Sequence, residues 1–255
     1  MDGHFLMQRP IPPTYHDSVD NTYRYGSTQG GLREPHHGVE FPNGQGTPVL
    51  AVADGAVVFA GSDKQVTLAW LPAFYGNVIV LEHHFPGASQ TIYSLYAHLS
   101  SVSVSQGQLI TTGQQIGQVG STGTAIGSHL HFEVRAGNDD YSSNRNPELW
   151  LVPLAGTGVL AGRIQDKTGN LVDGMVNVQR INNGVLNPLS VTSLQTYVTN
   201  ELQPVKADDT FNENFAAGEL PAGDYRLTLV YYGGILEQYV KIVPGKLTFV
   251  KLTLK

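Results

Sequence analysis

The chain has 255 residues, 14% of them charged, with a formal net charge of −6 and no cysteine. This length can form one large domain or two smaller ones. The negative charge argues against binding to nucleic acid, which needs a basic surface, and the lack of cysteine excludes disulfides and thiolate metal ligands. No apolar run approaches the roughly 20 residues that span a bilayer.

The first part of the chain is predicted to be all-β. About 30 residues rich in Pro, Tyr and Gly form an irregular lead-in without a sustained period. Short segments rich in Val, Ile and aromatic residues follow, each bounded by turn-forming residues. These predicted strands lie within residues 49–61, 77–85, 91–99, 108–120 and 129–135. We find no segment of 12 or more residues with a helical period.

A second β domain is predicted to begin near residue 155, where prolines and glycines interrupt the pattern (NPELWLVPLAGTG, 146–158). Beyond it, apolar and polar residues alternate around Gly-containing turns in 158–180, 220–234 and 236–255. Strands of this length at such intervals indicate a small antiparallel sandwich of the immunoglobulin-like type. We therefore predict domains at 1–154 and 155–255.

The segment HLHFEVR (129–135) carries two histidines in a strand pattern. Because side chains alternate along a strand, one face presents His129, His131, Glu133 and Arg135, and the other presents Leu130, Phe132 and Val134. Histidines two residues apart can bind or flank one small ion. Taken alone, the segment also fits a surface strand with incidental polar residues.

A second candidate pair lies in HHGVE (36–40). A fully extended chain would separate the Cα atoms of His36 and Glu40 by roughly 13 Å, too far for one ion. The chain must therefore bend, and Gly38 between them permits an unusual backbone angle. A polar loop is the alternative for this pair alone. His37 could compete as a ligand, although its parity with Val39 suggests the other face.

Other histidines fall in strand patterns as well. His98 shares a predicted strand face with Tyr96, where a lone histidine is usually structural, and His83 and His84 are expected to be exposed at a strand end. Taken together, imidazoles and one carboxylate suit a catalytic zinc ion with three protein ligands and an open position. Histidines beyond the three ligands would be suited to proton transfer.

The first domain contains a series of spaced motifs: HHGVE, GTPVLAVADGAVVFAG, YGNVIVLEH, YAHLSSVSVSQGQ, GQQIGQVGSTG and GSHLHFEVR. In these motifs residues 22–150 resemble the lysostaphin-like (LytM-type) zinc metalloendopeptidases, which cut peptide cross-links in bacterial peptidoglycan. The resemblance implies a Gly-rich β-barrel or sandwich of the duplicated hybrid motif type.

The same resemblance implies roles for five residues. Zn²⁺ would be held by His36, Glu40 and His131, with His98 and His129 as catalytic residues near the open position. Which of these two histidines is the general base stays open, and Tyr25 or Tyr96 is a candidate oxyanion contact. One difference is that the family's carboxylate ligand is normally Asp, whereas this chain has Glu40.

The second domain resembles the carboxypeptidase-regulatory or Cna-B-like β-sandwiches in GRIQDKTGNLVDGMVNV, LPAGDYRLTL and VPGKLTFVKL. The resemblance implies a spacer, a stabiliser or a module that docks on the cell wall or on a protein partner. It implies no active site in this domain.

The sequence therefore predicts a zinc metalloendopeptidase that hydrolyses peptidoglycan peptides outside the cell or in its envelope, with a leader removed or not included. The alternative is a weak or inactive relative that binds cell wall or regulates another hydrolase. A third class, a non-enzymatic barrel similar to biotinyl and lipoyl carriers, lacks the Met-Lys-Met turn that would hold a prosthetic group.

Overall fold

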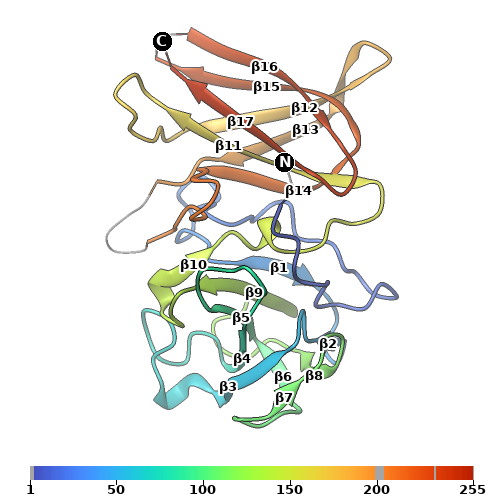
Figure 1. Ribbon diagram of the computed structural model, residues 1–255, viewed down its shortest axis with the longest axis vertical. Coiled ribbons are helices and arrows are strands. Elements are labelled where there is room, and N and C mark those ends of the chain that lie inside the picture. Colours follow the sequence, from blue (N-terminus) through green and yellow to red (C-terminus); the bar gives the residue numbers. More distant parts are fainter. Residues whose placement is uncertain (1–2, 199–203, 233, 255) are drawn as a thin grey trace. The chain divides into compact units, whose positions relative to one another are not determined.

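The computed structural model describes residues 3–198, 204–232 and 234–254 (Figure 1). In these residues the chain is all-β, as predicted, apart from three short 3-10 helices at Asp63–Gln65, Tyr141–Ser143 and Pro147–Leu149. No described helix has the length and apolar character needed to cross a membrane. The chain divides into two compact units, which are described separately.

The first unit comprises Phe5–Thr22 and His37–Val152, and the second comprises Tyr23–His36, Pro153–Lys255 and the first four residues. Both units are thus discontinuous in sequence. The boundaries 1–154 and 155–255 stay a prediction, because compact units need not coincide with domains that fold alone.

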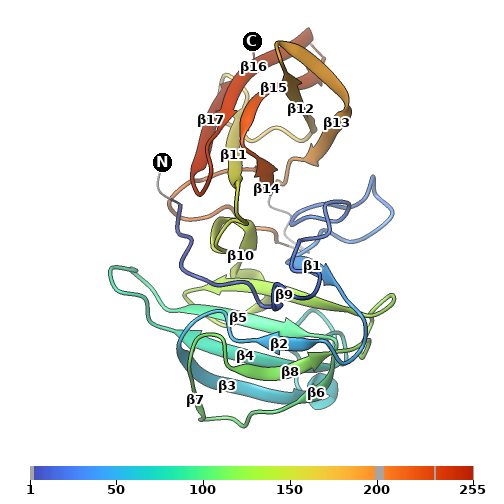
Figure 2. The same cartoon turned by 90° about the vertical axis from the view of Figure 1, so that its right-hand side faces the viewer.

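The main sheet of the first unit has the strand order β1-β9-β5-β4-β3-β7, with β10 also paired to β9 (Figures 1 and 2). Its strands are β1 (Val39–Pro42), β3 (Gly55–Ser62), β4 (Asn77–His83), β5 (Ile92–Ala97), β7 (Leu109–Ile110), β9 (His129–Ala136) and β10 (Asn144–Arg145). All these pairs are antiparallel. Strand β9 lies between β1 and β5, which are far apart in sequence.

A smaller sheet of the first unit has the order β2-β8-β6. Its strands are β2 (Pro48–Leu50), β6 (Leu99–Val102) and β8 (Gln115–Val119). The two sheets approach closely at Gly117 of β8, where an added Cβ would lie 3.5 Å from Ile79 of β4 and still closer to the Ser101 carbonyl. Glycine is required at this position by the Ser101 carbonyl of the adjacent strand β6, whereas the distance to Ile79 is an ordinary packing contact.

One prediction about the first unit is wrong. His83 is not exposed at its strand end but fully buried. Its Nδ1 bonds the Asp54 carbonyl at 2.7 Å and its Nε2 bonds the Ser94 hydroxyl at 2.7 Å. Burial lowers the pKa of His83, partly opposed by the Asp54 contact. His84, by contrast, is exposed as predicted.

The second unit contains two sheets, with the orders β14-β11-β17 and β13-β12-β15-β16. Their strands are β11 (Thr157–Gln165), β12 (Met175–Asn182), β13 (Val185–Gln195), β14 (Phe215–Pro221), β15 (Gly223–Tyr231), β16 (Gly234–Ile242) and β17 (Leu247–Thr253). Leu160 and Phe215 from one sheet share a buried apolar cluster with Val178 and Leu227 from the other.

One pair in the second unit departs from the antiparallel pattern that we predicted, because β11 and β17 are parallel. The physical reason lies in the turn before β17. The Gly245 N–H donates to the Thr157 carbonyl, and the Val159 N–H donates to the Lys246 carbonyl. The two strands therefore start side by side and run in the same direction.

Candidate metal centre

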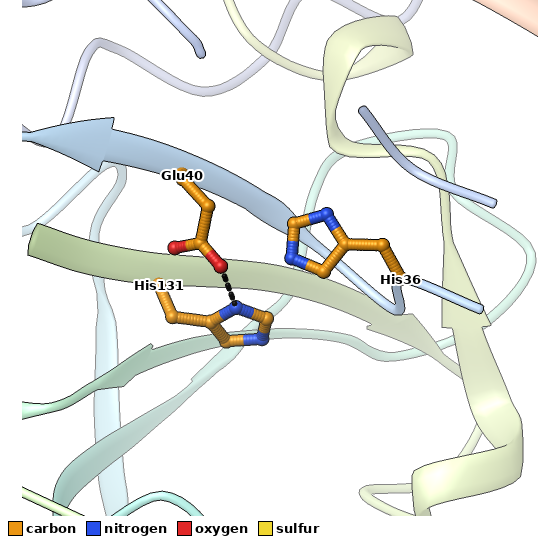
Figure 3. Close-up of side chains that lie close together, drawn as sticks. All are labelled: His36, Glu40 and His131. Atoms are coloured by element: carbon orange, nitrogen blue, oxygen red, sulfur yellow. Dashed lines mark hydrogen bonds and ion pairs between the residues drawn. The ribbon is translucent and has the colours of Figure 1, made fainter. Parts of the chain in front are cut away.

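The pairing of β1 with β9 places Glu40 directly opposite His131. His131 Nδ1 lies 3.1 Å from Glu40 Oε1. Ligand atoms of His36, Glu40 and His131 all lie within 4.8 Å of one another (Figure 3). Two imidazole nitrogens and a carboxylate oxygen form a donor set that zinc prefers, with bonds of about 2.0–2.2 Å. The residues present therefore fit a zinc ion.

His36, the residue before the segment His37–Val152, has a defined ring orientation. Its Nδ1 donates to the Tyr23 carbonyl at 2.8 Å, and its ring stacks on that of Tyr23 with a centroid separation of 4.0 Å. With the proton on Nδ1, the lone pair of the imidazole is on Nε2. A backbone bond of this kind is the usual way to orient a metal-binding histidine.

Gly38 is needed between the two ligands of HHGVE, but not for an unusual backbone angle, since its φ is not positive. A Cβ at this position would lie 3.0 Å from His131 Cε1 and Nε2, and closer still to the Phe132 carbonyl oxygen. Glycine is therefore required because the Phe132 carbonyl and, next, the His131 ring lie directly against residue 38.

The two histidines predicted to be catalytic lie beside the three candidate ligands. The His98 ring centroid is 4.9 Å from that of His129 and 5.7 Å from that of His131. His98 follows β5 with a left-handed φ of 62°. Its Nδ1 donates to the Thr122 carbonyl at 2.8 Å. The structure thus brings together all five residues that the sequence singled out.

His129 contacts the carboxylate of the site directly. Its Nε2 lies 3.0 Å from Glu40 Oε2, and its Nδ1 lies 3.2 Å from the Gly127 carbonyl. Each oxygen of Glu40 therefore faces a different histidine, because Oε1 faces His131. The longer side chain of Glu, compared with Asp, reaches both rings from β1.

The pKa values of His98 and His131 are shifted in opposite directions. Burial, with a smaller contribution from His131, lowers the pKa of His98 to about 4. Burial also disfavours the charge on His131, but the carboxylates of Glu40 and Glu133 outweigh it and raise its pKa to about 10. A metal ion at Nδ1 must therefore displace a proton that the two carboxylates stabilise.

Three further buried residues lie on or against the polar face of β9, and the sequence gives no signal of their role. Glu133 and Arg135 are fully buried, as is Tyr75 in the segment before β4. Although burial favours the neutral acid, Arg135 and His131 hold the pKa of Glu133 far below its usual range. The alternation of HLHFEVR places Glu133 and Arg135 on the His131 face, but nothing in that segment signals that the face is buried.

Three other candidates are engaged elsewhere. The Tyr96 hydroxyl accepts the Val52 N–H and the Ser94 hydroxyl, each at 3.0 Å. The Tyr25 hydroxyl donates to the Lys206 carbonyl at 2.8 Å within the second unit. His37 stacks on Tyr141 with a centroid separation of 3.9 Å. The contacts of Tyr25 and Tyr96 therefore do not support an oxyanion role for either residue.

Comparison with known families agrees with this geometry. Residues 34–144 match the model of Peptidase family M23. This match covers less than half of the chain. The match includes all five histidine and glutamate residues of the site. It ends before the second unit's β strands, so the resemblance of that unit to Cna-B-like sandwiches stays a prediction.

Individual relatives match the same part of the chain. The DD-carboxypeptidase/endopeptidase Mpg of Neisseria meningitidis is 40% identical over 100 residues, covering 39% of this chain and 20% of Mpg. The murein hydrolase activator NlpD of Salmonella typhimurium is 32% identical over 123 residues, covering 48% of this chain and 27% of NlpD. The alignments thus span only a fifth to about a quarter of these relatives.

Among solved structures, a zinc-containing peptidase from Vibrio cholerae is similar, with 31% sequence identity and a TM-score of 0.40. The alignment covers 52% of this chain and 37% of that one.

Proposed function

We propose that the part of the chain that matches Peptidase family M23 is a zinc-dependent endopeptidase that hydrolyses peptide cross-links of peptidoglycan. One observation carries the proposal: ligand atoms of His36, Glu40 and His131 lie within 4.8 Å of one another, and the rings of two further histidines lie beside them. When bound, zinc acts as a Lewis acid that acidifies water and polarises a carbonyl group. Mpg, named as an endopeptidase, supports the reaction class.

His98 and His129 are proposed to move the protons of the reaction. Each ring has its Nδ1 beside a backbone carbonyl, that of Thr122 for His98 and that of Gly127 for His129. With the proton held on Nδ1, the His98 ring has its lone pair on Nε2, whereas His129 Nε2 faces the accepting Glu40 Oε2 at 3.0 Å and donates to it. One Nε2 takes a proton from the attacking water and returns it to the leaving amine. The other ring, when protonated, donates a hydrogen bond to the developing oxyanion.

A second candidate function follows from two observations. NlpD, which is similar over almost half of this chain, is named as an activator of murein hydrolases. The carboxylate of the site is Glu40 instead of the shorter Asp expected from the family resemblance. The alternative is therefore a domain that binds cell wall or regulates another hydrolase.

We further propose that the protein acts outside the cell or in its envelope, since its substrate would be there. The second unit would be a spacer, or a module that docks on the cell wall or on a protein partner. These proposals rest on the peptidoglycan-related names of the relatives and on the predicted sandwich.

Digestion of purified peptidoglycan tests the proposal. The zinc-loaded protein should release new amino termini, and His129→Ala should abolish the release while retaining bound zinc. His84→Ala is a matched control, because His84 is an exposed histidine that follows β4 and its ring bonds Glu82 at 2.9 Å, outside the site. Zinc-loaded wild type that releases nothing from several kinds of peptidoglycan would favour the regulatory alternative.

A further inference from the structure

Behind His131, away from Glu40, lies a buried group of three side chains: Tyr75, Glu133 and Arg135. His131 Nε2 lies 3.0 Å from Glu133 Oε1, which also accepts a hydrogen bond from the Tyr75 hydroxyl. Arg135 Nε donates to Glu133 Oε2 at 2.9 Å, and a terminal nitrogen of Arg135 lies 2.9 Å from the same oxygen. Each oxygen of Glu133 thus lies within hydrogen-bond distance of two donor groups.

The donor and acceptor chemistry of these groups gives the network one direction. Arginine has donors only, so Arg135 must donate to Glu133 Oε2 and, at 2.9 Å, to the Tyr75 oxygen. Because the Tyr75 oxygen accepts from Arg135, its own proton points to Glu133 Oε1. The Glu133 carboxylate already accepts hydrogen bonds from Arg135 and Tyr75, and it has no proton to donate. Its contact with His131 is therefore a hydrogen bond that Glu133 accepts. The proton of His131 that faces Glu133 is therefore on Nε2.

Arg135 is itself held in place from the far side. One terminal nitrogen donates to the Asp139 carboxylate at 3.0 Å and to its carbonyl at 3.1 Å. The other donates to the Leu68 carbonyl at 3.2 Å. Arg135 therefore cannot turn away from Glu133 without losing several bonds in a site closed to water.

We propose that Tyr75, Glu133 and Arg135 are positioning residues that keep the proton of His131 on Nε2 and so present Nδ1 to the zinc ion. This inference rests on the proposed zinc site, because it concerns the ring that would be a ligand. Outer carboxylates of this kind orient metal-binding histidines, and their loss commonly weakens metal affinity about 10- to 100-fold.

Glu133→Gln tests the proposal by replacing one carboxylate oxygen with an NH₂ group. An amide has one accepting oxygen and one donating NH₂ group. With the oxygen toward His131, the NH₂ group would face the guanidinium of Arg135. With the NH₂ group toward His131, the ring would accept at Nε2 and hold its proton on Nδ1, where zinc must bind. Either orientation should weaken zinc binding about 10- to 100-fold, measured by competition with a chromophoric chelator.

The chain offers a matched control on β4, which is separated from β9 by β5 in the same sheet. Glu82 of β4 also bonds a histidine and a tyrosine, with His84 Nε2 at 2.9 Å and the Tyr93 hydroxyl at 3.3 Å. This group is not part of the zinc site, and the His84 side chain is 73% exposed. Glu82→Gln and Tyr93→Phe should therefore leave zinc affinity unchanged, whereas Tyr75→Phe should weaken it by less than Glu133→Gln does.

A second measurement separates positioning from a general effect on folding. In the zinc-loaded protein with ¹⁵N-labelled histidine, NMR should show the metal on Nδ1 of His131 and the proton on Nε2. Tyr75→Phe removes only a hydroxyl, so it keeps the test valid if Glu133→Gln does not fold. Wild-type zinc affinity in both variants, or metal on Nε2 of His131, would overturn the proposal. Wild type that binds no zinc would instead refute the proposed function.

Discussion

Glu40 on β1 and His131 on β9 are direct cross-strand partners, with His131 Nδ1 3.1 Å from Glu40 Oε1. Register in an antiparallel pair decides which face each side chain occupies, and a slip of one residue would move Glu40 to the opposite face. The same register pairs Pro42 with His129. Two strands that are separated by 86 residues of sequence (43–128) thus assemble most of the candidate centre.

Glu40→Asp should weaken zinc binding, although Asp is the residue expected from the family resemblance. In this backbone the longer side chain lets one oxygen face His131 and the other face His129, at 3.1 and 3.0 Å. A side chain shorter by one methylene would withdraw from both rings. Zinc competition and peptidoglycan digestion, measured on the same preparation, check the prediction. A gain of activity in the variant would show instead that Glu40 detunes the site.

Gly38→Ala should destabilise the protein by about 1–3 kcal/mol, because the new methyl group would overlap its neighbours. That group would lie 3.0 Å from the His131 ring and closer to the Phe132 carbonyl, so the β1–β9 pairing would have to shift. Thermal unfolding of the full chain measures the loss. Gly44→Ala is the matched control, since an added Cβ there has no neighbour within 4 Å. Equal effects of the two changes would contradict the close approach of the Phe132 carbonyl and the His131 ring to residue 38.

The stability of the second unit should fall as the pH rises, because of Glu213. Burial, opposed in part by the Tyr197 hydroxyl, raises the pKa of this carboxyl to about 8 from the usual 4.5. The folded state thus binds the proton more tightly than the unfolded state does. The stabilisation is complete below pH 4.5 and is lost as the pH rises through about 8. The slope between these values approaches 1.4 kcal/mol per pH unit.

Glu213→Gln removes the titrating group and should flatten this pH dependence. Unfolding midpoints of the full chain between pH 5 and 9 provide the measurement. Glu237→Gln serves as the control, because Glu237 lies on β16 with an exposed side chain. A steep fall with pH that persists in Glu213→Gln would assign the dependence to another group.

Much of the fold could be predicted from local sequence patterns. The alternation of HLHFEVR and the apolar segments 77–85 and 91–99 correspond to β9, β4 and β5. Strand β13 (Val185–Gln195) was not among the predicted strands, since its Asn, Pro and Ser residues obscure the alternation. The parallel pairing of β11 with β17 was not predictable either, because it depends on a turn between strands distant in sequence.

The candidate site could be predicted only in part, for a related reason. His36, Glu40, His98, His129 and His131 stood out because side chains of their kind, in that spacing, suit a metal. Tyr75 and Arg135 carry no such signal. Their role depends on burial on both faces of β9, which arises when the segment before β4 packs over that strand.

Mass spectrometry of fragments released from peptidoglycan of known structure tests the central claim most directly. The zinc-loaded protein should produce fragments whose masses correspond to hydrolysis of one kind of peptide bond in the cross-links, and His129→Ala should produce none. Intact cross-links after incubation with the zinc-loaded wild type would contradict the proposed endopeptidase activity. Equal cleavage by wild type and His129→Ala would contradict the site assigned to it.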